Sequence, residues 1–508
     1  MKPLRYITFA LIFPLFQHAQ FSRVLISEDA RTEELSIAIN PANAKEIIAA
    51  SRAGFYLSSD SGRTWKRDDP ACIKVSAYRS PQVFWSQRGS CLSGLTGRDS
   101  TLVVIRTSGD RLVYNNCYNL NWESGKISEG LKSFGELSNG TLHTIWTQMD
   151  TRNSKNHNDS SFIFYTSLNH GKRAWSKPTR VSSYGGDCSN GDSTLMGATC
   201  CTGPDHQVYA AWAGNQGLVF RNLSDTIARS EKIITTIKNG WQYKVGKNAS
   251  NGLPTIACDL SQGEHRGRLY VCWSDERHGP SNKNVFLSYS DDQGENWTEP
   301  IVVTYRPNHK EQFMPCMTID QSNGTVYILY YDQQNFVDGD LADLYLAQSK
   351  NGGLKFDYYR VNATPIKPHP QQFYGRYFGL SAVNGVVRPI WAQSDKNNIP
   401  GIYTALIDEA ALKTYNKNYS DDIEIQKTFT WSAKMKIDFT LKNNAEVSAV
   451  ITKPLEAGFE KTVAKNKKMR KGRNSLVVDT TKLGLQKGNY TLTLYYKHNN
   501  TFVWIIEE

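Results

Sequence analysis

Acidic, basic and phenolic side chains recur at one kind of position in this 508-residue chain, at the ends of short apolar runs. Trp273-Ser274-Asp275-Glu276-Arg277 is the fullest example, and Tyr330-Tyr331-Asp332 resembles it. Carboxyl groups can move protons, and guanidinium groups can hold a carboxylate in forked hydrogen bonds. We expect candidate catalytic groups at Asp275, Glu276, Asp332 and Tyr377, and candidate substrate-binding groups at Arg52, Arg277, Glu311, Tyr374 and Arg376.

Each of these positions also has a purely structural explanation. Asp275 and Asp332 stand at equivalent places in a repeat, where an Asp side chain can cap its own turn. Arg277 and Arg376 can form salt bridges at a rim. The His residues do not cluster at ligand spacing, and the nine Cys residues form no CxxC pair. We therefore expect carboxylate-based chemistry with no metal and no cofactor, and we assign no disulfide pairs.

An internal repeat predicts the elements that position these residues. The run Leu269–Trp273 recurs as Val326–Tyr330 and, more weakly, as Val208–Trp212. Its aromatic position returns every 57 to 66 residues from Trp146 to Trp391. This period is in the range of a four-stranded propeller blade. Each copy follows another apolar run and a Gly or Asn turn, which is typical of a β-hairpin. Seven hairpins are predicted, the first two at 35–50 and 81–95.

A second signature follows many of these hairpins. Residues 58–65 and 290–297 read S-x-D-x-G-x-x-W, and residues 167–175 and 349–356 are near matches. In such a turn the Asp or Asn side chain caps backbone N–H groups, Gly supplies a positive φ, and the aromatic ring packs beneath. The octets lack the oxygen ligands of a calcium loop. We therefore interpret them as structural turns.

These octets resemble Asp boxes, and with the Trp- and Tyr-bearing strands they make residues 21–408 similar to the Asp-box propellers of the sialidase superfamily, in particular its secreted bacterial sialidase-like proteins. The resemblance implies an all-β fold with a β-propeller at residues 20–408. Sialidases of this superfamily have six blades. The hairpin count favours seven, with the last blade closed by a strand at 21–26, and leaves six open.

The same resemblance implies glycoside hydrolysis without a metal. An arginine cluster would hold the substrate carboxylate, a Tyr activated by a Glu would act as nucleophile, and an Asp would be the acid/base. The chain departs from this pattern because the Arg-Ile-Pro motif is absent and no Tyr–Glu pair aligns. Two alternatives therefore stay open, a non-catalytic propeller that binds a glycan or a protein, and a polysaccharide lyase.

The N-terminus predicts export. Lys2 and Arg5 precede an apolar run at 7–16, and small or polar residues follow up to Ala19, as in a secretory signal peptide at 1–19. No later segment is long and apolar enough to span a bilayer. With 39% hydrophobic and 21% charged residues, the chain is not a disordered protein. We expect a secreted or cell-surface protein whose partner is a glycan or glycoprotein, anionic ones included.

The last hundred residues lie outside the repeat. A polar linker is predicted at 409–422, and apolar and polar residues alternate at 434–441, which favours a small β-sandwich at 423–508. The phrases at 471–479 and 483–492 resemble the sorting domain of type IX secretion cargo, which would imply contact with that secretion machinery. The end Glu507-Glu508 departs from the usual basic tail. The basic run 461–473 has no interleaved aromatics, so no nucleic-acid partner is expected.

Overall fold

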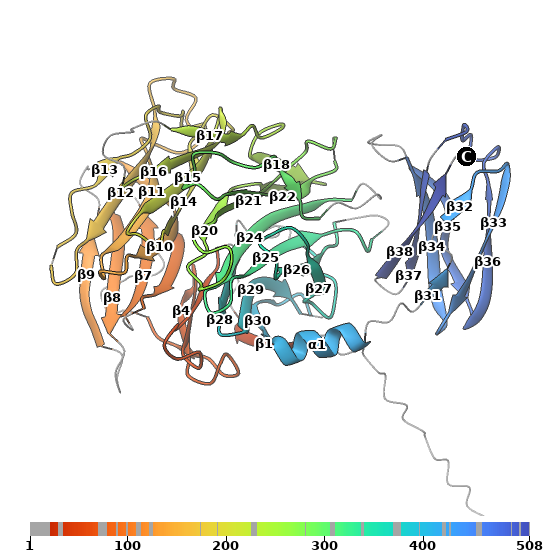
Figure 1. Cartoon of the computed structure of the whole chain (residues 1–508), viewed down its shortest axis with the longest axis horizontal. Helices are drawn as coiled ribbons and strands as arrows, with labels where there is room; N and C mark the ends of the chain where they lie inside the picture. Colours follow the sequence, from red (N-terminus) through yellow and green to blue (C-terminus); the bar gives the residue numbers. More distant parts are fainter. Residues whose placement is uncertain are drawn as a thin grey trace, which may run out of the picture.

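The computed structural model describes residues 21–506 with internal gaps, and these residues are mostly in β-strands (Figure 1). The gaps within this range are residues 29–33, 70–78, 88–89, 98–99, 108–112, 121–124, 173, 190, 225–230, 280, 305–309, 337–339, 369–376, 396, 419–422, 426–427, 454–459, 489 and 497–498. The signal peptide predicted at 1–19 lies outside the described residues.

Within the described residues, seven antiparallel sheets have four strands each. The first four sheets are β2 (Ser36–Ile39), β3 (Ile47–Ser51), β4 (Gly54–Ser58) and β5 (Lys66–Arg67); β6 (Arg79–Trp85), β7 (Ser90–Gly97), β8 (Ser100–Thr107) and β9 (Val113–Asn119); β10 (Ile127–Glu136), β11 (Leu142–Met149), β12 (Ser161–Leu168) and β13 (Thr179–Arg180); and β14 (Met196–Thr202), β15 (Val208–Gly214), β16 (Gly217–Asn222) and β17 (Lys232–Thr235). The other three are β20 (Thr255–Cys258), β21 (Leu269–Asp275), β22 (Asn284–Ser290) and β23 (Ile301–Val302); β24 (Gln312–Asp320), β25 (Thr325–Asp332), β26 (Asp343–Ser349) and β27 (Asp357–Arg360); and β28 (Gly379–Val383), β29 (Val386–Ser394), β30 (Pro400–Asp408) and β1 (Ser22–Ser27).

The sheets follow one another in a closed circuit. The first strand of each sheet lies against the first strand of the next, from β2 through β6, β10, β14, β20 and β24 to β28, which returns to β2. β1 completes the last sheet by pairing antiparallel with β30, as the sequence predicts for the strand near 21–26. The last sheet therefore combines strands from the two ends of the circuit (Figure 1).

The repeated aromatic residues lie in the second strands, between neighbouring sheets. Trp146, Trp212, Trp273, Tyr330 and Trp391 are all less than 2% exposed. A strand buried on both faces becomes apolar along its length. This explains why β21 and β25 read as continuous apolar runs and why their polar residues appear only at the ends.

The octet turns connect the third and fourth strands. After β22, the hydroxyl of Ser290 donates to Asp292 Oδ1 at 2.7 Å and accepts the amide N–H of Gly294 at 2.9 Å. Asp292 also accepts the amide N–H of Asn296 at 2.8 Å. Gly294 has a φ of +90°, which favours glycine. The turn at 58–65 has the same bonds, and so, with Asn in place of Asp, does that at 349–356.

One insertion interrupts the regular order. Between the fourth and fifth sheets, β18 (Gln242–Val245) and β19 (Asn248–Asn251) form a two-stranded hairpin. The side chain of Trp241 donates to the carbonyl of Thr194 at 3.3 Å, and the amide N–H of Gln242 donates to Asp192 at 2.9 Å. The hairpin is therefore anchored to the loop before β14, and the repeat did not predict it.

The chain after β30 begins with a helix where the sequence analysis expected a polar linker. α1 (Glu409–Asn418) is capped by Asp408, whose carboxylate accepts the amide N–H of Ala411 at 2.8 Å. Leu412 and Tyr415, three residues apart, are buried in the core of the adjoining sheets. This apolar pair holds the segment in a helix, and the rest of the predicted linker, 419–422, lies outside the described residues.

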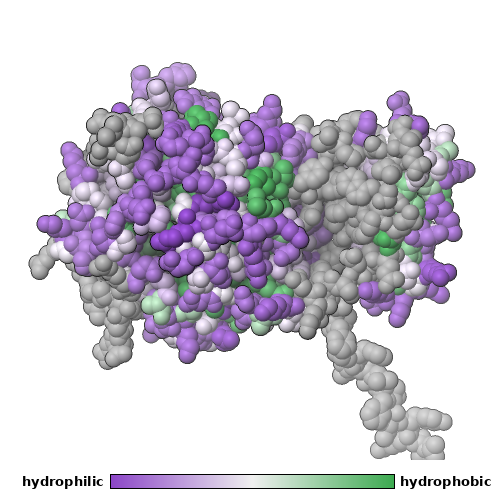
Figure 2. Space-filling model, viewed as in Figure 1, coloured by the Kyte–Doolittle hydropathy of each residue, from purple (hydrophilic) through white to green (hydrophobic). Residues whose placement is uncertain are grey.

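Two further sheets follow α1 and share one hydrophobic core. Alternating residues Met435, Ile437, Phe439 and Leu441 are buried in this core, as their pattern predicts. On the face of the molecule in Figure 2, most of the coloured surface is hydrophilic. One sheet has the order β31 (Ile423–Ile425), β33 (Lys434–Leu441), β36 (Gly472–Asp479); the other has the order β32 (Thr428–Thr430), β38 (Asn499–Ile506), β37 (Tyr490–Tyr496), β34 (Ala445–Thr452), β35 (Glu460–Met469).

Candidate functional site

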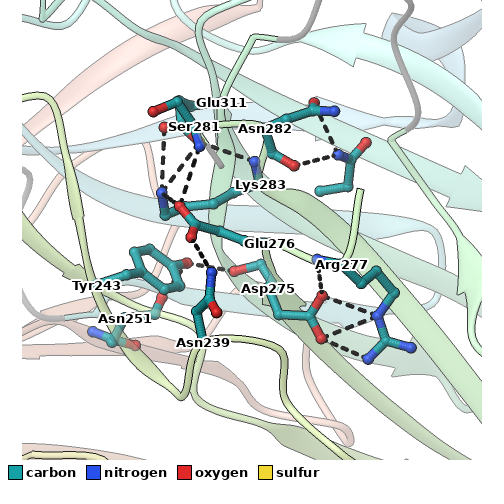
Figure 3. Close-up of polar contacts among 12 residues, drawn as sticks. Asn239, Tyr243, Asn251, Asp275, Glu276, Arg277, Ser281, Asn282, Lys283 and Glu311 are labelled. Carbon is teal, nitrogen blue, oxygen red and sulfur yellow. Dashed lines mark hydrogen bonds and ion pairs between the residues drawn. The ribbon is translucent and has the colours of Figure 1, made fainter. Parts of the chain in front are cut away.

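The fifth and sixth sheets bring five of the predicted residues to one edge. Asp275 ends β21, Glu276 and Arg277 begin the loop that follows, and Asp332 ends β25. Glu311 directly precedes β24. Because neighbouring strands are antiparallel, a second strand ends where its first strand begins. The loops therefore meet, and Figure 3 shows four of these residues in one group.

Asp275 and Arg277 form an ion pair in which the aspartate is buried. The Asp275 carboxylate is 0% exposed and accepts hydrogen bonds from Trp273 Nε1 at 3.0 Å and from Arg277 Nε at 2.9 Å. Arg277 Nη2 also donates to the carbonyl of Thr236 at 3.0 Å, and the guanidinium lies 4.6 Å from the ring centroid of Phe286. Both groups are thus engaged within the chain, the arrangement expected of a support for the loop.

Lys283 joins the two glutamates, and the sequence analysis did not identify it. Its side chain is 2% exposed, and its ammonium group forms ion pairs with Glu276 and, at 3.3 Å, with Glu311 Oε1. The amide N–H of Lys283 donates to Glu311 Oε2 at 3.0 Å. One ammonium group between two carboxylates holds them close together (Figure 3).

The surroundings of the two glutamates shift their pKa values in opposite directions. Burial raises the pKa of Glu311 above its usual range, even though Lys283 favours the charged form. Burial acts in the same direction on Glu276, but hydrogen bonds from Lys283 and Asn239 outweigh it and lower the pKa of Glu276. Such a difference in pKa between neighbouring carboxyl groups is the arrangement that acid–base catalysis requires.

The inserted hairpin completes the group. Asn239, just before β18, donates to Glu276 Oε2 at 2.9 Å. The Tyr243 hydroxyl lies 2.5 Å from Ser274 Oγ and donates to the carbonyl of Asn251 at 2.7 Å, and the Lys283 ammonium is 4.9 Å from the Tyr243 ring centroid. Burial raises the pKa of Tyr243 well above its ordinary value. The phenol is therefore a neutral hydrogen-bonding group at neutral pH.

Asp332 is connected to this group by a hydrogen bond from Gln312, the residue that follows Glu311. The two residues face each other across β24 and β25, and Gln312 Nε2 donates to Asp332 Oδ1 at 3.2 Å. The same oxygen accepts the amide N–H of Gln334 at 2.7 Å. Asp332 is 0% exposed, so it caps its turn from a buried position.

The other four predicted residues are not placed in this group. Arg52 is half-buried in the turn between β3 and β4, and the carbonyl of Tyr377 accepts the amide N–H of Leu35 at 3.2 Å, in the contact between the last and first sheets. Tyr374 and Arg376 lie outside the described residues. Tyr377 also lines a cavity that is enclosed by the first strands of the sheets.

That cavity has a volume of about 380 Å³ and is lined by residues of all seven first strands. Four of these strands have an irregular register near their start, between residues 79 and 82, 129 and 133, 196 and 199, and 313 and 316. Such bulges redirect side chains and are common beside functional sites. The glutamate pair is not part of the cavity wall.

The described residues contain neither a metal-binding cluster nor a membrane-spanning helix. No group of three or more His, Cys, Asp or Glu side chains among them is arranged to hold a metal ion. None of their helices is long and apolar enough to cross a membrane.

Comparison with known proteins finds similarity only among solved structures. No protein-family model matches the chain, and no curated protein matches it either. Among solved structures, phage phi92 endosialidase is 10% identical, with 88% of this chain and 75% of that chain covered and a TM-score of 0.43. Trypanosoma rangeli sialidase in complex with the inhibitor DANA is 8% identical, with 87% and 85% covered and a TM-score of 0.40. Penicillium chrysogenum α-L-arabinanase complexed with arabinobiose is 13% identical, with 61% and 94% covered and a TM-score of 0.39. At such low identities and TM-scores, these likenesses assign neither a substrate nor a catalytic residue to this chain.

Proposed function

We propose that the protein is an exported, sialidase-like glycoside hydrolase that acts on glycans. The observation that carries the proposal is the pair Glu276 and Glu311, held by one ammonium group and shifted in pKa in opposite directions. Glycosidases use two carboxyl groups, one protonated and one ionised, on either side of the bond that breaks. In this pair the pKa of Glu311 is raised and that of Glu276 is lowered, so Glu311 is the more readily protonated of the two.

The roles follow from the two environments. Burial raises the pKa of Glu311, so Glu311 binds a proton more readily than Glu276, and we assign it the role of giving a proton to the oxygen of the leaving sugar. Glu276 stays ionised and stabilises the positive charge that develops on the sugar ring. Lys283 orients both carboxyl groups, and Asn239 and Tyr243 support them from the hairpin. Glu311, first expected to bind substrate, thus becomes the proton donor.

Asp275 and Arg277 support the site in this proposal and do not react. Their polar atoms bond to one another and to neighbouring groups of the chain. Asp332 has the same supporting role through Gln312. Arg52, Tyr374, Arg376 and Tyr377 remain candidates for binding substrate groups.

A panel of glycans, including sialylated and uronic-acid polymers, tests the hydrolysis. We expect sugar release by the purified protein, and a loss of about a hundredfold or more in Glu311→Gln and in Glu276→Gln, because a positioned acid or base contributes roughly 10² to 10⁴ in rate. The matched control is Glu299→Gln, an exposed carboxylate outside the group. Release that is equal in all variants would contradict the assignment.

A second candidate is a non-catalytic propeller that binds a glycan. The observation in its favour is the burial of the pair, because Glu311 is 8% and Lys283 2% exposed. Such a pair can be a structural ion pair that only holds the loops together. Binding of a glycan without any turnover, by the native protein and by Glu311→Gln alike, would select this candidate.

The sheets support a seven-bladed propeller at residues 20–408 followed by a β-sandwich at 423–508. The seven four-stranded sheets in a closed circuit agree with seven blades, and the shared core of the last two sheets agrees with a sandwich. A signal peptide at 1–19 and a type IX sorting role for the sandwich complete the proposal of export to the cell surface or beyond. Detection of the protein in the culture medium of its source cells tests it.

A further inference from the structure

A basic strip runs along the C-terminal sheets. Residues 461–473 contain seven basic side chains and no acidic one. All seven are exposed: Lys461, Lys465, Lys467, Lys468, Arg470, Lys471 and Arg473. This basic strip is a continuous positive feature of the surface.

The fold concentrates these charges at two sheet edges. β35 is the last strand of its sheet and β36 the last strand of the other, and the two are in contact. Acidic groups lie beside the strip at its start and opposite its middle. Glu446 faces Lys468 across the β34–β35 pair, and Glu460 forms an ion pair of 3.5 Å with Lys310. Positive charge therefore remains in excess along the outer edge.

The side-chain types of the basic strip indicate which kind of partner it would bind. Lys and Arg side chains attract polyanions by counterion release and by direct ion pairs. The strip carries no aromatic side chain, so it lacks the stacking platform with which proteins hold single-stranded nucleic acids. Four of its lysines lie on one extended edge strand, where successive side chains point to opposite faces, so their charges flank a straight backbone and suit a linear chain of anionic groups.

We propose that this basic strip is a binding site for an anionic polysaccharide, one that carries carboxylate or sulfate groups. The site shares no residue with the glutamate pair and does not depend on hydrolysis. It would hold the protein on an anionic glycan whether or not the propeller cleaves it. Lysines on an edge strand also hinder pairing between copies of a protein, and this is the competing explanation.

Titration of the full chain with heparin, a sulfated and carboxylated polysaccharide, tests the proposal. We expect binding at low ionic strength that weakens steeply as salt is added. Replacement of four exposed lysines by Gln should weaken binding about tenfold or more, since one cation near an anionic surface contributes roughly fivefold. The four are Lys461, Lys465, Lys467 and Lys468.

The matched control removes the same charge elsewhere, from the exposed Lys66, Lys177, Lys350 and Lys355. The control should bind heparin as the native protein does, and both variants should keep the native circular dichroism. If the fourfold variant unfolds, Lys467→Gln/Lys468→Gln replaces it, with a smaller loss of affinity expected. Absence of heparin binding, an equal loss in the control, or aggregation of the variant with unchanged affinity would overturn the proposal. Tighter binding of single-stranded DNA than of heparin of equal charge would assign the strip to nucleic acid and overturn it as well.

Discussion

Single residues decide the electrostatics of this protein, and Lys283 is the clearest case. The sequence analysis found Glu276, Glu311 and Asp275 because they end or begin apolar runs. Lys283 was missed because nothing local links it to Glu311, which is 28 residues away. Such a partnership between two sheets is not visible in the order of the residues. The pKa difference between the glutamates could not be predicted for the same reason.

Replacement of Lys283 by Met should destabilise the protein strongly. The change leaves Glu276 and Glu311 without their shared cation, and breaking a buried ion pair from one side removes about 3 kcal/mol or more of unfolding free energy. Chemical denaturation at pH 7 measures the loss. The loss should shrink near pH 5 as the carboxyl groups take up protons. Lys244→Met, at an exposed position, is the control, and an equal effect in both would contradict the role of Lys283.

His143 makes the fold sensitive to acid. The ring is 0% exposed, it packs against Tyr165 and Gly135, and neither ring nitrogen has a hydrogen-bond partner. Burial lowers its pKa from 6.5 to about 3. Between these values the unfolded chain binds a proton that the folded protein does not, so stability is lost as pH falls below 6.5.

Replacement of His143 by Leu should remove part of the loss of stability that occurs as the pH falls. From pH 6.5 to pH 5 the native protein should lose roughly 2 kcal/mol through this residue, at about 1.4 kcal/mol per pH unit. The difference between His143→Leu and the native protein, measured by denaturation at both pH values, isolates the contribution from that of the carboxylates. His157→Leu changes an exposed residue, so this variant should lose as much stability as the native protein when the pH falls. Identical pH dependence in all three proteins would refute the account.

At the scale of elements, the repeat predicts what each sheet has in common and misses what one sheet alone contains. The buried second strands and the octet turns recur, so their residue types reveal them. Among the residues that the structure describes, the hairpin of β18 and β19 occurs once, between two copies of the repeat. It contributes Asn239 and Tyr243 to the candidate site. The helix α1 was missed because its apolar pair, Leu412 and Tyr415, stands among polar residues.

The octet turns also join neighbouring sheets, and Gly294 tests this. A side chain at Gly294 would lie 2.1 Å from Phe220 in β16, and the residue has a φ of +90°. Gly294→Ala should therefore lower the unfolding free energy by about 2 kcal/mol or more, from backbone strain and the collision together. Gly171→Ala is the matched control, because its φ is +76° and nothing lies within 4 Å. Gly171→Ala should lose only the unfolding free energy that comes from backbone strain. An equal loss in both variants would show that the contact between residue 294 and Phe220 does not contribute.

For the whole molecule, closure of the circuit depends on the first described residues. The aromatic ring of Phe21 stacks on Tyr415 of α1 at 5.4 Å between ring centroids and meets Tyr359 of the sixth sheet edge-on at 6.4 Å. β1 and α1 thus tie the two ends of the circuit to each other. The sequence predicts the closing strand from its position, but only the structure reveals the aromatic contact.

Phe21→Ala should therefore destabilise the entire circuit. We expect a loss of about 3 to 5 kcal/mol, as for other buried phenylalanines. Leu25→Ala, on the strand that directly follows Phe21 but 41% exposed, should change stability by only about 0.5 kcal/mol. Thermal unfolding of both variants measures the difference. Similar midpoints would show that the strand does not hold the circuit closed.

The central claim is that Glu311 protonates the leaving sugar while Glu276 stays ionised. The most direct test compares Glu311→Gln with the native enzyme on two substrates of the same sugar, a natural glycan and an aryl glycoside whose leaving group needs no proton. We expect the variant to lose about a hundredfold or more in kcat on the glycan, the range for a lost general acid, and to keep most of its rate on the aryl glycoside. Equal losses on both substrates, or no loss on the glycan, would contradict the account.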